Sequence, residues 1–403
     1  MELNEEDAPA LQGLRIVELA EGISGPYCGK LLADLGAEVT KIEQPRIGDF
    51  CRGVGPFAGD QPSAESGLLF NFLNTNKRGI SLDPSFSFGR ELLLALIERA
   101  DVFVYGGPPA GIDTLGLDVA TLTAANRLLV VTFVTPFGLD GPYRDRTASE
   151  LVSLHMSGLG ILMADQVRMP PPHKAGGNQA QLVAGLTAAI ATMEALFARE
   201  ANGEAQVVDV SHLEPIASFQ FMNVARWVYM GDPGQRGFTE GSRKIFCRDG
   251  AVLMAIGQDH QWRAFQELMG RPDWAKAPEF ETQAGRRQNA GELWAQVQGW
   301  AADLEKAELC RLVQSRHIPA FPENSIAEAV DSEQIRQRGF IQELPLASGG
   351  TAAAPIAPYV FSETPVRCGR PAPRLGQHNR EVFCGELGLS NEELGRAFEA
   401  GVV

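Results

Sequence analysis

The chain has 403 residues, 44% of them hydrophobic and 21% charged, and a formal net charge of −15 at pH 7. A chain of this size buries a large core and is expected to divide into about two domains. Its acidic balance argues against nucleic acid and anionic membrane surfaces as partners, because both require a basic protein face. Residues 1–7 are acidic and lack the apolar core of a secretory signal, so a cytoplasmic location is expected.

Strand and helix patterns alternate along the first part of the chain. Residues 14–19 (LRIVEL) are typical of a buried strand, 27–35 of a helix closed by Gly36, and 38–43 of a second strand. A further helix pattern covers 88–100, and further strand patterns cover residues 79–83, 101–105, 128–135 and 206–210. This alternation predicts a mostly parallel sheet covered by helices.

The apolar stretch 182–198 is interrupted by two threonines and a glutamate, which favours a buried amphipathic helix over a membrane span.

The later segments predict a second, smaller domain. Residues 245–258 are typical of a hairpin that turns at Asp249-Gly250, and helix patterns follow over 261–315. Residues 345–375 are rich in Pro and Gly and predict an extended segment. We therefore expect domain segments at 1–215, 216–330 and 331–403.

Metal and dinucleotide chemistry find little support in the sequence. The six cysteines and six histidines are scattered, and none has the spacing of metal ligands, so no metal site is expected. Gly22 and Gly25 follow the first strand, but without the full G-x-G-x-x-G pattern they favour a tight turn over a dinucleotide-binding loop. No cofactor is therefore expected in this chain.

Eight segments of the chain resemble, in the same order, segments of the family III CoA-transferases. They are residues 11–49, 76–83, 89–102, 115–117, 135–143, 207–214, 256–262 and 374–382. A single segment is weakly specific, whereas eight in order across nearly the whole chain are highly specific. The resemblance implies an α/β fold of two interlocked ring-like subunits. Each subunit would have a Rossmann-like large domain (1–215 and the return segment 331–403) and a small α+β domain (216–330).

The resemblance also places a glutamine where the family carries its nucleophile. Residues 174–184 (KAGGNQAQLVA) resemble the segment that holds the nucleophilic Asp, and Gln181 occupies its position. A carboxylate can attack a thioester to give an acyl anhydride, whereas an amide side chain is not basic enough to do so. The resemblance therefore implies a homologue without its nucleophile.

Five positions at which the family contacts CoA also depart from its pattern. The family offers a polar residue beside the thioester, cationic groups after its second and third strand signatures, an ENFRPG-like loop, and an Arg before Leu-Gly-Leu. This chain has at these positions Ile23, Gln44, Ser85, Gly106 in the sequence YGGPPA, and Thr114. Proteins hold CoA phosphates with cationic side chains and backbone amides. The pattern therefore predicts a subunit that does not itself bind CoA. The CoA thioester would be a substrate only of a complex between this chain and another subunit.

Two further sets of residues are candidates for the site. Glu150 falls near the family's catalytic pocket and is a candidate substitute nucleophile, but a helix-start carboxylate that interacts with the helix dipole is the simpler interpretation. Gly257, Gln258 and Asp259 fall where the family has a glycine-containing loop near its acyl site. This second set is a candidate wall of the acyl pocket.

Three hypotheses of function follow. The first is a catalytically silent subunit that is interlocked with a homologous catalytic subunit. Two-subunit family members make succinyl-CoA the candidate donor and (R)-benzylsuccinate, in anaerobic toluene degradation, the candidate acceptor. The second is an α-methylacyl-CoA racemase-like isomerase, which would need an acid–base pair that Ser149, Glu150 and Gln181 do not supply. The third is a non-enzymatic binding protein on the same scaffold.

Overall fold

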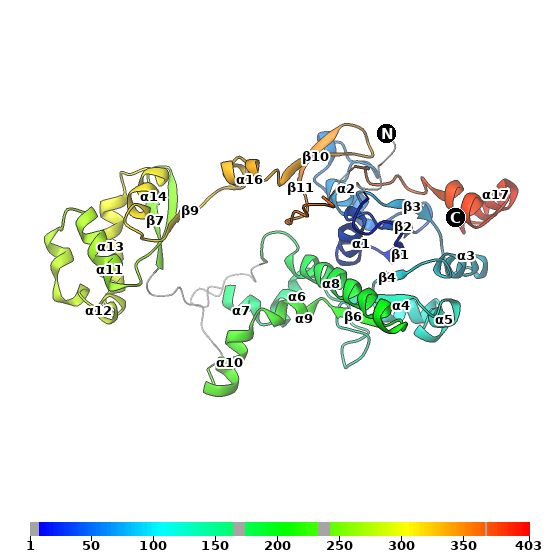
Figure 1. The fold of residues 1–403 in the computed structure, drawn as a ribbon, viewed down its shortest axis with the longest axis horizontal. Helices are drawn as coiled ribbons and strands as arrows, with labels where there is room; N and C mark the ends of the chain where they lie inside the picture. The colour runs from blue at the N-terminus through cyan, green and yellow to red at the C-terminus, as the bar shows by residue number, and fades with distance from the viewer. Residues whose placement is uncertain (1–7, 164–173, 233–241, 367–368) are drawn as a thin grey trace. The chain divides into compact units, whose positions relative to one another are not determined.

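The computed structural model describes residues 8–163, 174–232, 242–366 and 369–403 (Figure 1). The chain forms two compact units, of which the larger comprises Met1–Gly234 with Gly339–Val403 and the smaller comprises Gln235–Arg338. The expected small domain, 216–330, thus differs from the smaller unit at both ends. Residues 216–234 belong to the larger unit, because helix α9 (Leu213–Ser218) packs against helix α8 (Gln179–Asn202).

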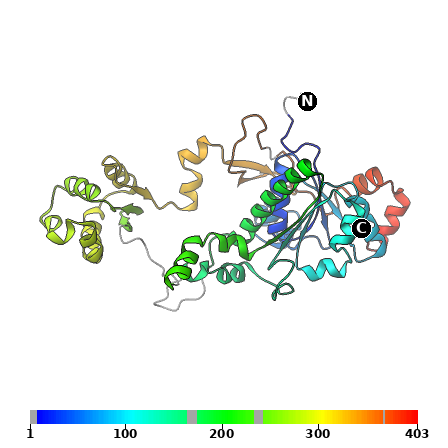
Figure 2. The same cartoon turned by 60° about the horizontal axis from the view of Figure 1, so that its bottom comes forward.

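A six-stranded sheet forms the centre of the larger unit. Its order is β3-β2-β1-β4-β5-β6, and every neighbouring pair is parallel, which confirms the predicted sheet (Figure 2). The strands are β1 (Arg15–Ala20), β2 (Glu38–Glu43), β3 (Arg78–Ser81), β4 (Val102–Gly106), β5 (Val130–Thr135) and β6 (Val207–Ser211). Because the order reverses between β1 and β4, a crevice is expected at their carboxyl ends.

Side chains of the strands alternate between two cores, one on each face of the sheet. Val102 and Val104 of β4 pack with helices α1 (Ser24–Asp34) and α8. Phe103 and Tyr105 pack on the opposite face with α3 (Ser87–Ile97), α5 (Val119–Ala125) and the carboxyl-terminal helix α17 (Asn391–Glu399). Both faces are buried, as expected of parallel strands that consist largely of apolar residues.

Helix α1 begins earlier than the sequence pattern predicts. It starts at Ser24 rather than at residue 27, because Pro26 lies in the first turn, where a helix tolerates its missing N–H. The other short helices of this unit are α2 (Leu68–Leu73), α4 (Pro109–Thr114), α6 (Glu150–Met156), α7 (Leu159–Met163) and α10 (Phe221–Met230).

Helix α8 is the longest helix of the described chain. By length and composition alone it could cross a membrane, although core helices of globular proteins pass the same test. Its small residues Ala184, Gly185 and Ala188 are buried, and they pack against α1 and the sheet. The predicted helix at 182–198 is thus confirmed, with one face in the core.

The smaller unit has an antiparallel sheet and a set of helices. Strands β7 (Ser242–Cys247) and β8 (Gly250–Ala255) form the predicted hairpin, but its two-residue turn is Arg248-Asp249, one residue before the predicted Asp249-Gly250; β9 (Ala320–Pro322) pairs with β8. The helices are α11 (Asp259–Leu268), α12 (Gln283–Gln288), α13 (Ala290–Ala301), α14 (Lys306–Gln314), α15 (Ile326–Val330) and α16 (Glu333–Gln337). Trp262 and Phe265 of α11 anchor their common core.

The return segment contains a hairpin that the sequence did not predict. Strands β10 (Ile341–Pro345) and β11 (Thr351–Pro355) pair antiparallel, and the first of them precedes the predicted extended segment 345–375. Gly349 and Gly350 have positive φ angles in the connecting turn, where glycine is favoured.

Candidate functional site at the carboxyl edge of the sheet

A cavity of about 710 Å³ lies at the carboxyl ends of β1 to β4, and we call it the sheet-edge cavity. Segments that follow these four strands contribute Glu21, Gln44, Ser85 and Gly106 to its lining. Its position is the crevice where the strand order reverses, which is the usual ligand site of open parallel sheets. Its volume lies in the ordinary range for small-molecule sites.

Four of the five positions predicted to have lost CoA contacts meet in this one cavity. Gln44, Ser85, Gly106 and Thr114 all line it, although they are up to 70 residues apart in the sequence. Ile23 does not line it. Its side chain is buried among Cys51, Phe70, Leu73 and Ala372 instead.

The lining of the sheet-edge cavity is acidic. Glu21 and Asp83 line it, and no described lining residue is Lys or Arg. Burial and the nearby carboxylate of Asp49 raise the pKa of Glu21. Burial also acts to raise the pKa of Asp83, but hydrogen bonds from Ser85 and Gln44 outweigh it and lower that pKa. A phosphate in this cavity would therefore meet carboxylates without compensating cations.

At two of the predicted positions, Gln44 and Ser85, an N–H group is already hydrogen-bonded to Asp83. The Gln44 Nε2 amide donates to Asp83 Oδ2 at 2.9 Å, and the Ser85 backbone N–H donates to Asp83 Oδ1 at 2.9 Å. Residues that follow β2 and β3 are thus tied together by one carboxylate. These two N–H groups are therefore used within the chain and are not available to an anionic ligand.

Gln181 lies in the first turn of α8, and Glu150 caps that turn. The buried Glu150 carboxylate accepts from the backbone N–H of Ala180 at 2.8 Å and of Gln181 at 3.1 Å. These amides have no partner inside the helix, and a carboxylate satisfies both their hydrogen bonds and the positive end of the dipole. Glu150 therefore acts as a structural cap in this arrangement, and its two oxygens are engaged.

The start of α8 lies against the turn that leads from β1 into α1. A Cβ atom at Gly185 would approach the backbone oxygen of Ser24 to 2.4 Å, so the two helices touch there. Leu182 packs against the buried group that contains Ile23. The fold therefore brings the beginning of α8, through Leu182, against the group that contains Ile23.

Ser24 and His212 form a partly buried pair that sequence reasoning did not single out. Ser24 Oγ lies 2.8 Å from His212 Nε2, and burial lowers the pKa of His212 to about 4. His212 is therefore neutral at pH 7. The two residues are 188 positions apart, so no local pattern could have paired them.

The candidate acyl-pocket residues lie in the smaller unit, at the start of α11. The backbone N–H groups of Gly257 and Gln258 both donate to Gln261 Oε1 at 3.0 Å, and Asp259 pairs with Arg286 at 2.8 Å. The loop is thus held by Gln261 of its own helix and by Arg286 of α12, and the N–H groups of Gly257 and Gln258 are already satisfied.

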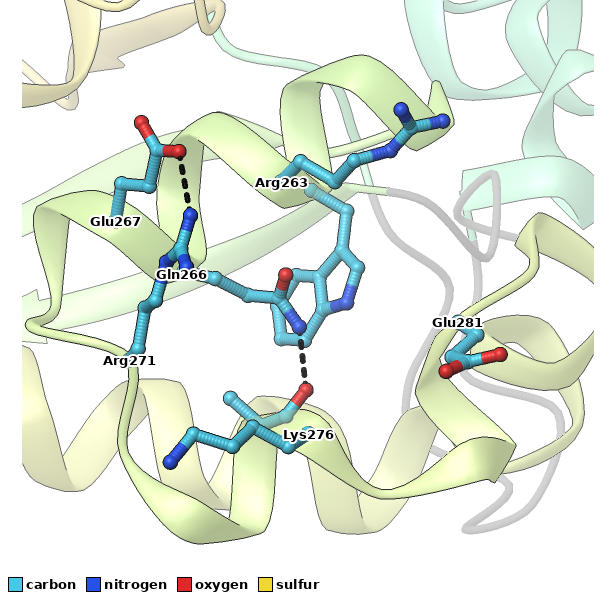
Figure 3. A pocket seen from close by; sticks show the side chains of 8 residues that line it. Arg263, Gln266, Glu267, Arg271, Lys276 and Glu281 are labelled. Carbon is cyan, nitrogen blue, oxygen red and sulfur yellow. Dashed lines mark hydrogen bonds and ion pairs between the residues drawn. The ribbon is translucent and has the colours of Figure 1, made fainter.

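The smaller unit also has a cavity of about 520 Å³, next to α11 (Figure 3). Its charged side chains are largely paired, because Arg271 bonds Glu267 at 2.9 Å and Lys276 bonds Asp273 at 2.8 Å. Figure 3 shows that the ends of Arg263 and Lys276 point away from each other. The cations thus do not converge on a common anion position. No group of three metal-ligating side chains was found among the described residues of either unit.

Comparison with known proteins shows the family to which the chain belongs. The sequence profile described as CoA-transferase family III matches residues 11–379. The chain is 31% identical over 415 residues to formyl-CoA:oxalate CoA-transferase of Streptomyces avermitilis, covering 98% of this chain and 99% of the relative. It is 31% identical over 406 residues to succinyl-CoA:(R)-benzylsuccinate CoA-transferase subunit BbsE of Thauera aromatica, covering 96% and 97%. A CAIB/BAIF family protein from Brucella suis has a similar structure, with a TM-score of 0.84 and 28% identity, covering 94% of this chain and 99% of that one. The chain therefore belongs to CoA-transferase family III.

Proposed function

We propose that this chain is the catalytically silent subunit of a heteromeric CoA-transferase. The observation that carries the proposal is the sheet-edge cavity, which gathers Gln44, Ser85, Gly106 and Thr114 at a nucleotide-type crevice without a lining cation. CoA carries several phosphate charges, and cationic side chains supply the strongest contacts to such groups. Gln181 adds the second loss, because an amide cannot replace a carboxylate nucleophile.

A homologous catalytic subunit would supply the chemistry. Its Asp carboxylate attacks the acyl-CoA thioester, forms an acyl anhydride and releases CoA thiolate. The donor carboxylate leaves as the thiolate attacks the aspartyl carbonyl, which gives an aspartyl thioester. The acceptor carboxylate then displaces the thiolate from this thioester to form a second anhydride, and the thiolate attacks the acceptor carbonyl, which gives the acceptor thioester and releases the Asp carboxylate. The similarity to a subunit of the (R)-benzylsuccinate enzyme supports succinyl-CoA as donor and (R)-benzylsuccinate as acceptor. That pair would place the complex in anaerobic toluene degradation.

The exposed apolar surface of helix α10 supports a partner subunit. None of its residues is buried, and Phe221, Trp227 and Tyr229 are 72%, 60% and 86% exposed. Nearby in the sequence, Phe197 of α8 is 75% exposed. Monomeric proteins rarely expose contiguous apolar patches of this kind, whereas obligate interfaces bury them. We therefore propose that a homologous, interlocked subunit covers α10.

The two alternative functions lack such support. A racemase-like isomerase would need an acid and a base on either side of the substrate α-carbon. Glu150 is engaged by two backbone amides, and Gln181 does not titrate. A non-enzymatic binding protein on the same scaffold would be favoured only if no catalytic partner subunit co-purified with this chain.

Titration of CoA into the purified complex tests the proposal. One class of CoA site per pair of unlike subunits is expected, because the described lining of the sheet-edge cavity in this chain contains no Lys or Arg. Native mass spectrometry of the same complex, purified from its source, gives the subunit stoichiometry. Saturation at two CoA per pair, or a complex of identical subunits, would overturn the proposal.

A further inference from the structure

Four charged side chains are buried together beneath the turn from β1 into α1, residues 20–26. Glu18, Lys41, Asp49 and Lys77 are each at most 2% exposed, and we call them the buried charge cluster. Burying charges costs several kcal/mol each unless they are well paired, and apolar residues often serve stability equally well. Stability alone is therefore a weak reason for such a cluster.

The charges alternate along the buried charge cluster. Lys77 Nζ bonds both oxygens of Glu18, at 3.0 and 2.8 Å. Lys41 Nζ lies 3.4 Å from Glu18 and 2.9 Å from Asp49. The carboxylates raise the pKa of Lys41 against the effect of burial, whereas burial lowers the pKa of Lys77 to about 8. Both lysines are therefore protonated at neutral pH, and the cluster has no net charge.

Further contacts of the cluster reach backbone atoms of residues 20–26, while Lys77 Nζ also bonds Asn74 Oδ1 at 2.9 Å and Asp49 also accepts from the Cys51 N–H at 2.9 Å. Lys41 Nζ donates to the Ala20 carbonyl at 2.7 Å, and Lys77 Nζ donates to the Pro26 carbonyl at 2.8 Å. Between them, the Gly22 N–H donates to the Asp49 carboxylate at 3.1 and 3.2 Å. Both ends and the middle of the turn are thus held by charged groups, which form the stronger kind of hydrogen bond.

This turn connects the two parts of the candidate site. Ala20 and Glu21 line the sheet-edge cavity, and Ser24 bonds His212 and touches α8 at Gly185. A displacement of the turn would therefore move the cavity wall and the contact with the start of α8 together. Lys77 itself lines no part of the cavity, so it acts on the site only through the groups that it bonds, among them the Pro26 carbonyl of the turn.

We infer that the buried charge cluster positions residues 20–26 between the sheet-edge cavity and the start of α8, with Lys77 as the positioning residue at the α1 end. The inference does not rest on the proposed function, because it concerns contacts within this chain only. It assigns no catalytic role to Lys77.

Hydrogen exchange of the assembled complex tests this inference with a matched pair of variants. Lys77→Met removes the charge and the donors but keeps the length of the side chain. Lys30→Met is the control, because Lys30 is equally buried but bonds only the side chains of Asp34 and Thr75, at 2.7 Å each. Exchange of residues 22–26, measured by mass spectrometry, is expected to accelerate at least about tenfold in Lys77→Met and to stay unchanged in Lys30→Met.

A second measurement distinguishes a loss of positioning of residues 20–26 from a general loosening of the fold. In Lys77→Met the titration midpoint of His212, followed by NMR of labelled histidine, is expected to move from about 4 toward its ordinary value of 6.5. In Lys30→Met it stays in place. Equal exchange of residues 22–26 in the two variants, or an unmoved His212 in Lys77→Met, overturns the inference.

A charge-neutral variant covers the case in which Lys77→Met fails to assemble. Glu18→Gln with Lys77→Met removes one charge of each sign, so no buried charge is left unpaired. The same local acceleration is expected in this double variant. Wild-type protection of residues 22–26 there would overturn the inference.

Discussion

The Glu150 carboxylate lies 3.1 Å from the backbone nitrogen of Gln181 and accepts its hydrogen bond. Glu150 thus caps helix α8, and Gln181 lies at the position that the sequence resemblance assigns to the nucleophile. A carboxylate introduced at position 181 would share the first turn of α8 with an existing negative charge. Like charges at such distances oppose ionisation of one another.

Gln181→Asp alone is expected to leave the chain without transferase activity. Nucleophilic catalysis needs the thioester held at attack distance, a positioning effect of up to roughly 7 to 11 kcal/mol in favourable cases. The sheet-edge cavity offers no lining cation for that purpose. The measurement is CoA transfer, with hydroxylamine trapping of an aspartyl intermediate, in a complex whose partner nucleophile has been changed to Ala. Gln181→Asn serves as the isosteric control, and turnover in the Asp variant only would refute the silent-subunit proposal.

Adding cations to the sheet-edge cavity is expected to create CoA binding. Gln44→Arg with Ser85→Lys would place two positive charges at positions that are now hydrogen-bonded to Asp83. Because charge-assisted bonds to phosphate are strong, a second CoA per pair should appear in calorimetric titration. Gln12→Arg with Ala124→Lys, at two exposed positions outside the cavity lining, adds the same charge as a control. Equal gains in both double variants would show only general electrostatic attraction.

The chain expressed alone is expected to aggregate, and changes on α10 are expected to relieve this. Phe221→Glu with Tyr229→Glu would make the exposed apolar helix polar, so a soluble chain that no longer assembles with its partner should result. Phe398→Glu on α17, where the side chain is 59% exposed, should change neither property. Size-exclusion chromatography and native mass spectrometry together report the solubility of the chain and its assembly with the partner. A stable homodimer of the unchanged chain would contradict this prediction.

Glu150→Gln is expected to destabilise the protein by about 1–3 kcal/mol, because it weakens two bonds at the buried start of α8. Glu200→Gln, in the exposed last turns of the same helix, should change the free energy of unfolding by less than about 0.5 kcal/mol. Urea unfolding of the complex measures both. Loss of CoA transfer without loss of stability would instead identify Glu150 as a substitute nucleophile.

His212 is expected to make the protein sensitive to acid. Its pKa is about 4 in the folded chain and 6.5 ordinarily, so the unfolded chain binds the extra proton between these values. Stability should therefore fall as the pH drops from 6.5 to 4, by at most about 3 kcal/mol. Urea unfolding across this range should show a shallower slope for His212→Asn and an unchanged slope for Ser24→Ala, which keeps the ring. If the free energy of unfolding changed with pH by the same slope in wild type and His212→Asn, His212 would not be the source of the acid sensitivity.

Much of the larger unit could be predicted from the sequence because its signals are local. The strand at 38–43 has the predicted bounds, and the hairpin turns at Arg248-Asp249, one residue before the predicted position. The start of α1 was misplaced by three residues because Gly25 and Pro26 are typical of turns as well as of a first helical turn. The hairpin of β10 and β11 was missed because Pro and Gly dominate its surroundings.

The sequence by itself determined the parallel sheet, the family and the absence of a carboxylate at position 181, since periodicity and residue identity are local properties. Only the tertiary structure decided that Gln44 and Ser85 bond one carboxylate, that Ser24 meets His212, and that Glu150 caps α8. These contacts join residues that are 30 to 188 positions apart or that meet through a third residue. Such pairs form only when strands and helices pack, because burial and distance in the folded chain select them from many possible partners.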